Sequence, residues 1–415
     1  MTANNGALDS LLVPATPTTY TLELTSHCNS ACVGCGNVFE RSLGEMDVER
    51  WRYLLTKLKP HILNLRVTGG EPTLFPQFPD LICRVNELAV PFVLFSNGLW
   101  PNFAETLALL LDCDHLDGVL ISLHGRDAAT HRAFAGVDSF SRVTATIRQA
   151  ARAGLKINTN TVFTRNNYED VAAIAALSCD LGASFAAFSR YYGPPTPVTD
   201  LTESEFRFAA ATVHNLKQQG IRVQFNNCVP MCFDGQPTKS CPAGITHCTI
   251  DPLGRVRPCT HTSQILGDLF NQSIVDIWHG EAVAQWRALI PSVCTTCAEF
   301  IRCRGACKAM ACHLGQDKDP LIRRPLSHPL SVGDPRKIKL YVDARPEPNF
   351  ALRKEAFGYL LVNRNQIIPV KTETRPLLDA LNGETTLRQI QRNFGAPGLA
   401  LVAYLFNKGL VKLVQ

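Results

Sequence analysis

Apolar and polar positions alternate in a regular rhythm along the first half of the chain. Short runs rich in β-branched and aromatic residues are followed, six times in series, by stretches with the apolar spacing of helices. Serial strand–helix units predict a parallel sheet with right-handed crossovers. Six units are too few for a closed eight-stranded barrel, so we expect an α/β fold with a partial, open (β/α)6 barrel. Its site should lie at the carboxyl ends of the strands.

The predicted strands and helices of this barrel have definite bounds. The strands are Tyr20–Thr25, Ile62–Thr68, Phe92–Ser96, Gly118–Leu123, Lys156–Thr164 and Ser184–Ser189. The helices are Val48–Lys59, Phe78–Leu88, Phe103–Leu111, Phe140–Ala153 and Tyr168–Leu181, followed by a helix at Glu203–Gln219 and a short strand at Arg222–Asn226.

The pattern changes beyond residue 227 and divides the rest of the chain. Residues 228–316 lack long periodic runs and are rich in turn residues and cysteine, which indicates a region held together by metal. Residues 317–336 are proline-rich and are predicted to be a linker. We therefore expect an N-terminal tail at 1–18, the barrel at 19–227, a cysteine-rich domain at 228–316, the linker, and a compact unit at 337–415.

The last unit is predicted to contain strands followed by helices, an α+β arrangement. Thr385 is the expected N-cap of its second helix. The predicted strands are Lys337–Val342, Gly358–Val362 and Gln366–Val370, and the predicted helices are Thr374–Leu381, Thr386–Phe394 and Gly398–Lys408.

The distribution of the cysteines along the chain is more informative than the overall composition. The chain has 16 cysteines, and ten of them fall between Cys228 and Cys312. A chain of 415 residues with 46% hydrophobic residues can bury its own cores and does not need disulfide staples. No signal peptide opens the chain and no apolar run approaches a membrane span, so we expect a reducing cytoplasm and metal-bound thiols. The scattered Cys83, Cys113 and Cys179 are expected to be buried small hydrophobes.

The first cysteine motif follows the first predicted strand. Cys28, Cys32 and Cys35 have C-x3-C-x2-C spacing, and three thiolates on one loop can hold three irons of a [4Fe–4S] cluster. This loop, together with "VTGGEP" at residues 67–72, resembles the radical S-adenosylmethionine (radical SAM) superfamily. The resemblance extends over about residues 19–227 and implies that the fourth iron binds SAM.

The same resemblance implies a set of SAM-binding residues. The glycine-rich motif would bind the methionine amino group through its backbone and its acidic residue, and Gly69 and Gly70 permit a close backbone approach. Gly34 stands where the family usually has an aromatic residue, so stacking on adenine would have to come from elsewhere. The implied cofactor-binding residues are Gly69, Gly70, Glu71, Pro72, Asn97, Ser122 and Gly34.

The second cysteine region resembles the SPASM extension of radical SAM enzymes, which carries two auxiliary [4Fe–4S] clusters. The resemblance implies Cys241, Cys259 and Cys307 for the first cluster, with Cys248 as candidate fourth ligand. It implies Cys294, Cys297, Cys303 and Cys312 for the second. Cys228 and Cys232 match no ligand position; one of them, Cys232 for example, is a candidate hydrogen-atom donor or a ligand of an open cluster, and otherwise they are a structural pair. On spacing alone, two structural zinc ions remain an alternative.

The C-terminal unit resembles the small winged-helix-like domain (PqqD-like) that recognises leader peptides. The residues that carry this resemblance are "GYLLVNRNQIIPV", "LLDALNGETTLRQI" and "LVAYLFNKGLVKL". From Arg336 to the end there are 13 Lys and Arg against 6 Asp and Glu, a balance that would attract an acidic leader. Winged helices also bind DNA, but the predicted helix after Thr386 offers only Arg388 and Arg392 to phosphates, so no nucleic acid is expected.

Together these resemblances imply an enzyme that matures ribosomally made peptides. It would cleave SAM to a 5′-deoxyadenosyl radical, with electrons from a flavodoxin or ferredoxin, and remove a hydrogen atom from a precursor peptide. A cross-link or a backbone rearrangement or excision is favoured. The alternatives are a peptide epimerase, a maturase of a folded protein, and a non-catalytic iron–sulfur protein that binds peptides. Tyr191 and Tyr192 either face the substrate or pack in the barrel.

Overall fold

The computed structural model describes residues 10–36, 44–330, 342–364 and 366–414. The chain forms two compact units. The first comprises residues 1–11 and 16–330, and the second comprises residues 12–15 and 331–415. Residues 317–330 of the predicted linker therefore belong to the first unit.

A ten-stranded sheet with the order β10-β9-β8-β1-β2-β3-β4-β5-β6-β7 organises the first unit. All neighbours from β8 to β7 are parallel. The prediction of a partial α/β barrel is confirmed, with β7 and β8 extending it by one strand on each side. The bounds are β1 Thr19–Glu23, β2 Asn64–Thr68, β3 Phe92–Ser96, β4 Leu116–Ser122, β5 Ile157–Val162, β6 Ala186–Ser189, β7 Val223–Phe225, β8 His247–Ile250, β9 Arg255–Arg257 and β10 Gly267–Asp268.

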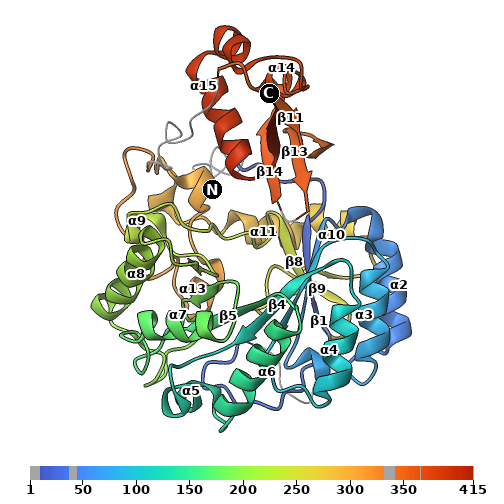
Figure 1. The fold of residues 1–415 in the computed structure, drawn as a ribbon, viewed down its shortest axis with the longest axis vertical. Helices are drawn as coiled ribbons and strands as arrows, with labels where there is room; N and C mark the ends of the chain where they lie inside the picture. Colours follow the sequence, from blue (N-terminus) through green and yellow to red (C-terminus); the bar gives the residue numbers. More distant parts are fainter. Residues whose placement is uncertain (1–9, 37–43, 331–341, 365, 415) are drawn as a thin grey trace. The chain divides into compact units, whose positions relative to one another are not determined.

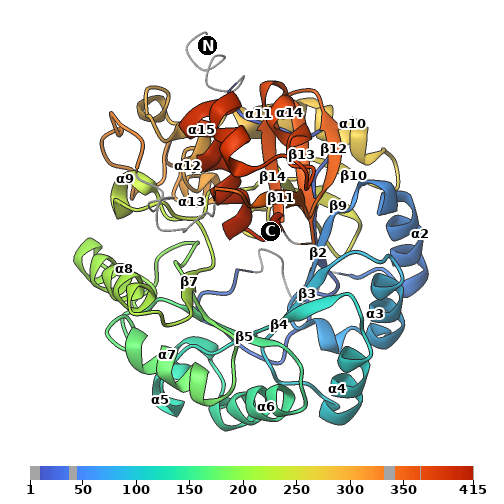
Figure 2. The ribbon, with the colours of Figure 1, turned by 45° about the horizontal axis from the view of Figure 1, so that its top comes forward.

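Helices cover the outer face of the curved sheet (Figures 1 and 2). Six of them lie within three residues of the predicted bounds, whereas the short helix α5 was not predicted. Its N-cap Asp127 and its third residue Thr130 form a capping box directly after the fourth strand. The helices are α2 Val48–Leu58, α3 Phe78–Asn86, α4 Phe103–Leu111, α5 Ala128–Ala135, α6 Phe140–Arg152, α7 Val171–Asp180 and α8 Glu203–Gln218.

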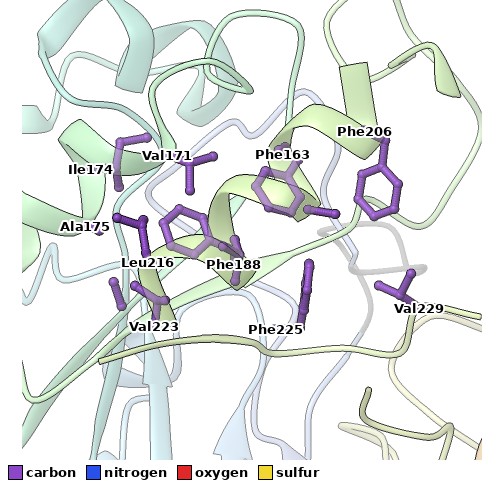
Figure 3. Packing of buried hydrophobic residues seen from close by; sticks show 14 of the residues in the cluster. Phe163, Val171, Ile174, Ala175, Phe188, Phe206, Leu216, Val223, Phe225 and Val229 are labelled. Carbon is purple, nitrogen blue, oxygen red and sulfur yellow. The ribbon is translucent and has the colours of Figure 1, made fainter. Parts of the chain in front are cut away.

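The late strands and helices share a dense aromatic core (Figure 3). Phe163 stacks on Phe188 with ring centroids 5.6 Å apart and meets Phe206 edge-on at 5.8 Å. All three rings are buried. Offset and edge-on pairs of this kind add to the free energy gained from apolar burial, so the last crossovers are held firmly against the sheet.

The cysteine-rich region continues the barrel sheet. His247 to Ile250 of β8 pair in parallel with Thr19 to Leu22 of β1, and β9 and β10 follow as antiparallel strands. Short helices fill the rest of the region. They are α9 Met231–Asp234, α10 Ile274–His279, α11 Glu281–Ala288, α12 Phe300–Cys303 and α13 Lys308–His313.

The second unit has its own core of leucine, isoleucine and valine. The predicted strand at 337–342 lies almost wholly outside the described residues, while β11, β12 and β15 were not predicted. The two last predicted helices both fall within α15, where the non-helical backbone of Gly395 (φ 65°) separates them, and the N-cap is Thr386, not Thr385. The bounds are β11 Arg345–Pro348, β12 Ala351–Glu355, β13 Gly358–Asn363, β14 Gln366–Lys371, α14 Arg375–Asp379, α15 Leu387–Asn407 and β15 Val411–Val414.

The prediction for the scattered cysteines was wrong at two of three positions. Cys113 is buried, but Cys83 and Cys179 are exposed. In each of their helices the buried face is formed by other residues, so the helical period places both thiols on the solvent side. No helix among the described residues is long and apolar enough to cross a membrane.

Candidate functional site

The barrel encloses a cavity of about 320 Å³. Inward-facing residues of β1 to β6 line it, together with the loop that follows β1. Cys28, Cys32 and Cys35 of that loop all face the cavity. The structure thus brings the three cysteines of the first motif to the strand ends, where a partial barrel is expected to hold its site.

Short backbone contacts fix the cysteine loop. The N–H groups of Ala31 and Val33 donate to the carbonyls of Ala135 and Phe134, at 3.0 and 2.9 Å. At Cys28 the sulfur accepts the N–H of Ser30 at 3.4 Å, and the Asn97 amide nitrogen lies 3.6 Å from the same sulfur. Hydrogen bonds of this kind stabilise a thiolate, the form that binds iron.

The glycine-rich turn after β2 packs directly against this loop. Gly70 donates to the carbonyl of Thr25 at 2.7 Å, and Glu71 donates to the carbonyl of His27 at 2.8 Å. A Cβ at Gly70 would lie 2.2 Å from the His27 oxygen, so only glycine fits. The two glycines line the cavity and present their backbone to it, as the resemblance requires.

The surroundings of Glu71 differ from those that the resemblance implies, in which its carboxylate would bind the methionine amino group. Its carboxylate is fully buried and accepts hydrogen bonds from Thr73 Oγ1 (2.7 Å), Ser96 Oγ (3.0 Å) and the Asn97 N–H (2.7 Å). Burial raises the pKa of Glu71 above its usual value, against these hydrogen bonds. The side chain thereby ties the ends of β2 and β3 together. Neither Glu71 nor Pro72 lines the cavity, whereas Asn97 and Ser122 do.

The ring of Tyr191 fills the space beside Gly34. A Cβ at Gly34 would lie 2.5 Å from Cε2 of Tyr191, which follows β6. The ring of Tyr191 therefore lies where an aromatic residue at position 34 would begin. Both Tyr191 and Tyr192 line the cavity.

Four thiols form a first group beside the barrel. Cys228 interacts with Cys241 and Cys307, and Cys307 interacts in turn with Cys241 and Cys259. Burial, followed by the charge of Cys241, raises the pKa of Cys259 to about 12. Burial thus favours the neutral form of these thiols, and a cationic group bound among them would stabilise the thiolates.

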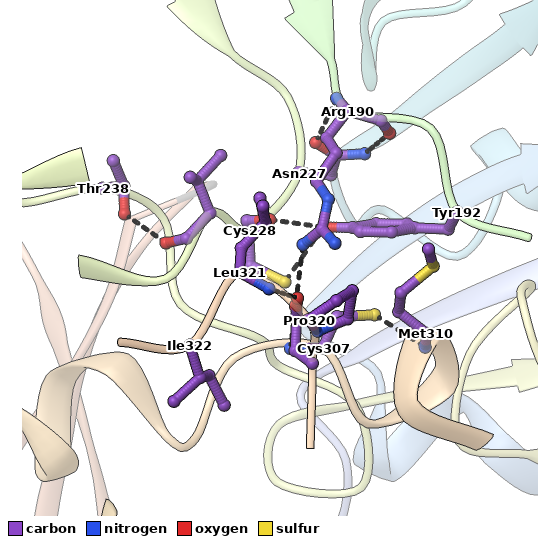
Figure 4. Close-up of polar contacts among 12 residues, drawn as sticks. Arg190, Tyr192, Asn227, Cys228, Thr238, Cys307, Met310, Pro320, Leu321 and Ile322 are labelled. Atoms are coloured by element: carbon purple, nitrogen blue, oxygen red, sulfur yellow. Dashed lines mark hydrogen bonds and ion pairs between the residues drawn. The ribbon is translucent and has the colours of Figure 1, made fainter. Parts of the chain in front are cut away.

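Polar contacts connect this first group to the cavity wall (Figure 4). Tyr192 donates to the carbonyl of Cys228. Arg190 forms a buried ion pair with Asp319 at 2.7 Å, and the same carboxylate oxygen accepts the N–H of Cys307 at 3.2 Å. Two cavity-lining residues thus contact or position two of the four cysteines.

A second group of thiols lines a small separate pocket and consists of Cys232, Cys294, Cys297 and Cys303. Burial, followed by the three neighbouring thiols, raises the pKa of Cys294 to about 12. The N–H of Arg323 donates to Cys232 at 3.3 Å, and the N–H of Leu326 donates to Cys297 at 3.4 Å. Both donors lie in the stretch that was predicted to be a linker.

Two cysteines of the predicted ligand sets lie elsewhere. Cys248 is buried within β8, opposite Tyr20, and burial alone raises its pKa. Cys312 is exposed in α13, and its electrostatic partner is Lys308. Cys228 lies with the first group of thiols and Cys232 with the second. Their C-x3-C spacing ahead of the other thiols was the available signal, but only the fold reveals their neighbours.

The two thiol groups fit iron–sulfur clusters better than zinc. A structural zinc needs four ligands within about 2.3 Å of one ion, whereas a cluster spreads its cysteines over four irons. Within the described part of the chain, no three Cys, His, Asp or Glu side chains converge on a point suited to one metal ion. The backbone N–H groups aimed at the sulfurs are a further match to cluster ligands.

Comparison with known proteins decides the identity of the fold. Residues 22–177 match the radical SAM superfamily, and residues 241–304 match SPASM, an iron–sulfur cluster-binding domain. The chain is a radical SAM enzyme with a SPASM domain. It therefore uses SAM and [4Fe–4S] clusters.

Known proteins are similar to this radical SAM enzyme over most of its length. The PqqA peptide cyclase of Xanthomonas campestris pv. campestris (strain 8004) is 29% identical over 360 residues, covering 81% of this chain and 94% of that protein. The crystal structure of Streptococcus suis SuiB has a TM-score of 0.64 at 17% identity, covering 77% of this chain and 80% of SuiB. A structure of anSMEcpe with AdoMet and the Cp18Cys peptide has a TM-score of 0.57 at 16% identity, covering 75% and 93%.

Proposed function

We propose that this radical SAM enzyme modifies a ribosomally made precursor peptide by introducing an intramolecular cross-link. The observation that carries the proposal is the 29% identity to a PqqA peptide cyclase over 81% of the chain. The cavity supports it, because the cysteine loop and six strands line one space of about 320 Å³. Electrons would come from a flavodoxin or a ferredoxin.

The proposed reaction removes two hydrogen atoms from the peptide. When bound, SAM and its cluster supply the 5′-deoxyadenosyl radical, which takes the first hydrogen atom. The second hydrogen leaves as a proton, and its electron passes to an acceptor. The chain's own residues bind and orient: Gly69 and Gly70 present their backbone to SAM, and Tyr191 is the proposed aromatic contact beside Gly34.

We further propose a revised set of metal ligands. Cys28, Cys32 and Cys35 hold the SAM-binding cluster, and each thiol group holds one auxiliary cluster with four cysteines. The first set is Cys228, Cys241, Cys259 and Cys307, and the second is Cys232, Cys294, Cys297 and Cys303. With four thiol ligands each, both auxiliary clusters have their irons closed to the substrate, which favours an electron-carrying role.

The positions of the thiols weigh against the epimerase alternative. An epimerase needs a hydrogen-atom donor that reaches the substrate. Cys232 lines the small pocket of the second thiol group and not the main cavity. A cross-link needs an acceptor for one electron instead, and Tyr192 joins the cavity wall to the first thiol group.

The deciding experiment is co-expression with the short open reading frames that neighbour the gene, followed by mass spectrometry of each peptide. A cross-link predicts the loss of two hydrogen atoms, and tandem fragmentation should stop within the linked segment. An unchanged mass with an inverted residue would support an epimerase, and a loss the size of a residue would support excision. Either result would overturn the cross-link proposal.

The second unit is proposed to bind the leader of that peptide. Its sheet β12-β13-β14 has two outer strands, and an extended peptide can add to such an edge. Removal of residues 342–415 should weaken peptide binding at least tenfold in a fluorescence anisotropy assay. Unchanged affinity would indicate a maturase of folded proteins instead.

A further inference from the structure

Arg66 presents a positive charge to the cavity that the structure leaves without a counter-charge. It lies in the middle of β2, opposite Thr21 of β1, and its side chain lines the cavity. Its guanidinium carbon lies 6.0 Å from the ring centroid of Phe95. None of the described residues forms an ion pair or a hydrogen bond with it.

The other charged residues that line the cavity are paired. Glu23 forms a buried ion pair with Arg257, and Arg190 forms one with Asp319. Arg66 is thus the exception among the described residues of the wall. Arg66 is half-buried and its side chain is open to the cavity, so a ligand in the cavity can reach it, and an anionic one would stabilise its charge.

The surroundings of Arg66 do not offset its charge. Lys239 and His247 both interact with it electrostatically. Burial lowers the pKa of His247 to about 3, so this ring is neutral at neutral pH. Burial alone lowers the pKa of Arg66, with no acidic neighbour to raise it. This part of the cavity is therefore electropositive and suited to an anion.

The position of Arg66 along β2 places its charge away from the proposed SAM site. Arg66 precedes Gly69 by three residues, which corresponds to about 10 Å along a strand. A SAM molecule held by Gly69 and Gly70 would lie nearer the strand ends. The charge deeper in the cavity is available for a second molecule.

We propose that Arg66 binds a carboxylate of the substrate peptide and so selects a segment carrying an acidic group in the cavity. A planar guanidinium matches a carboxylate through two parallel hydrogen bonds, a geometry that lysine does not reproduce. The inference rests on the proposed function, since it concerns the peptide that would enter this cavity. Side-chain and chain-terminal carboxylates share this chemistry, and the test separates them.

The test measures how fast Arg66 of the SAM-loaded holoenzyme reacts with phenylglyoxal, by mass spectrometry of the peptide that contains it. Three probes are compared at equal concentration: acetyl-Ala-Glu-Ala-amide, acetyl-Ala-Gln-Ala-amide, and acetyl-Ala-Ala-Ala with a free carboxyl terminus. A several-fold slower reaction with the first or third probe, but not with the glutamine probe, is expected, and shows which carboxylate binds. Equal rates with all probes, or full protection by SAM alone, would overturn the proposal.

Variants provide a second measurement once a precursor is available. Arg66→Gln should raise the KM for the peptide at least tenfold, and Arg66→Lys should restore only part of the loss. Arg142→Gln, an exposed change on α6, is the matched control. Protection from phenylglyoxal reports occupancy and not turnover, so its failure is distinguishable from failure to find a modified peptide.

Discussion

The hydroxyl of Tyr192 donates to the backbone carbonyl of Cys228 and lies 3.1 Å from the sulfur of the same residue. Tyr192 also meets His261 edge-on, with ring centroids 5.3 Å apart. Both Tyr192 and Cys228 are buried, and the tyrosine lines the cavity. One side chain therefore contacts both the substrate space and the first thiol group.

Tyr192→Phe should lower the reduction potential of the cluster proposed for the first thiol group. Loss of a hydrogen bond near the sulfur destabilises the more negative, reduced state. A tenfold change in the ratio of reduced to oxidised cluster corresponds to about 59 mV for one electron. A redox titration followed by electron paramagnetic resonance measures the shift, with Tyr168→Phe as control. An unchanged potential would show that the contact is only structural.

Replacement of the fourth cysteines should remove metal selectively. Cys228→Ala and Cys232→Ala should each lose the iron and sulfide of one cluster and part of the visible absorbance. Cys248→Ala and Cys312→Ala should keep full iron content, because neither thiol lies with the others. Iron and sulfide assays on reconstituted protein decide this. Retention of iron in the first pair and its loss in the second would reverse the proposed ligand sets.

Because Gly34 packs against Tyr191, a larger residue at position 34 should be tolerated only with a smaller residue at position 191. Gly34→Phe alone should impair SAM binding, because its side chain would overlap the tyrosine ring. Tyr191→Ala alone should weaken SAM binding by removing the aromatic surface. The double variant should bind SAM better than either single variant, as measured by equilibrium dialysis. Additive losses would refute a shared site.

Glu71→Gln should loosen the glycine-rich turn without opening the cavity. The amide would place a donor against the donors of Ser96 and Asn97, at a cost of about 1–3 kcal/mol for an unsatisfied buried group. We expect a lower thermal midpoint and roughly tenfold weaker SAM binding. Glu87→Gln, on the surface, is the control and should match the unmodified protein in both assays.

Stability should fall as the pH falls from 7.5 to 5.5. Burial lowers the pKa of His124 to about 3 and of His131 to about 4. Between these values and about 6.5 the unfolded chain binds more protons than the folded one, so the free energy of unfolding decreases with decreasing pH. Two such histidines account for about 2–3 kcal/mol at pH 5.5.

Thermal unfolding at several pH values tests this dependence. The variant His131→Gln should lose roughly a quarter of the histidine contribution, because burial lowers the pKa of four histidines: His124, His131, His247 and His261. The variant His115→Gln, at a residue outside this pair, should keep the full dependence. An equal pH dependence in all three proteins would contradict the assignment.

The barrel was predictable because its signals are local. The bounds of β3 and α4 match the hydrophobic pattern to the residue. The ligand sets were only partly predictable. Spacing identifies cysteines that share one loop, such as Cys294 and Cys297. It does not reveal that Cys232 joins them, because that contact depends on packing between distant segments.

Other misses also have physical causes. Strand β11 contains Pro346 and Pro348, which argue against a strand in a local reading, and its partner among the described strands is β15, at the far end of the unit in sequence. The fully buried carboxylate of Glu71 depends on donors 25 and 26 residues away, which no motif specifies. Arg66 gave no signal in the sequence, since the lack of a counter-charge among the described residues depends on which side chains the fold brings to the cavity.

The pairing of β8 with β1 has a consequence for how the enzyme can be divided. Without β8, the first strand would present an open row of backbone N–H and C=O groups, an edge prone to pair with another chain. In a fragment ending at residue 227, the strand that leads into the cysteine loop would therefore be paired on one side only, with β2. The SAM-binding barrel and the auxiliary-cluster region should accordingly be inherited, expressed and folded as one piece.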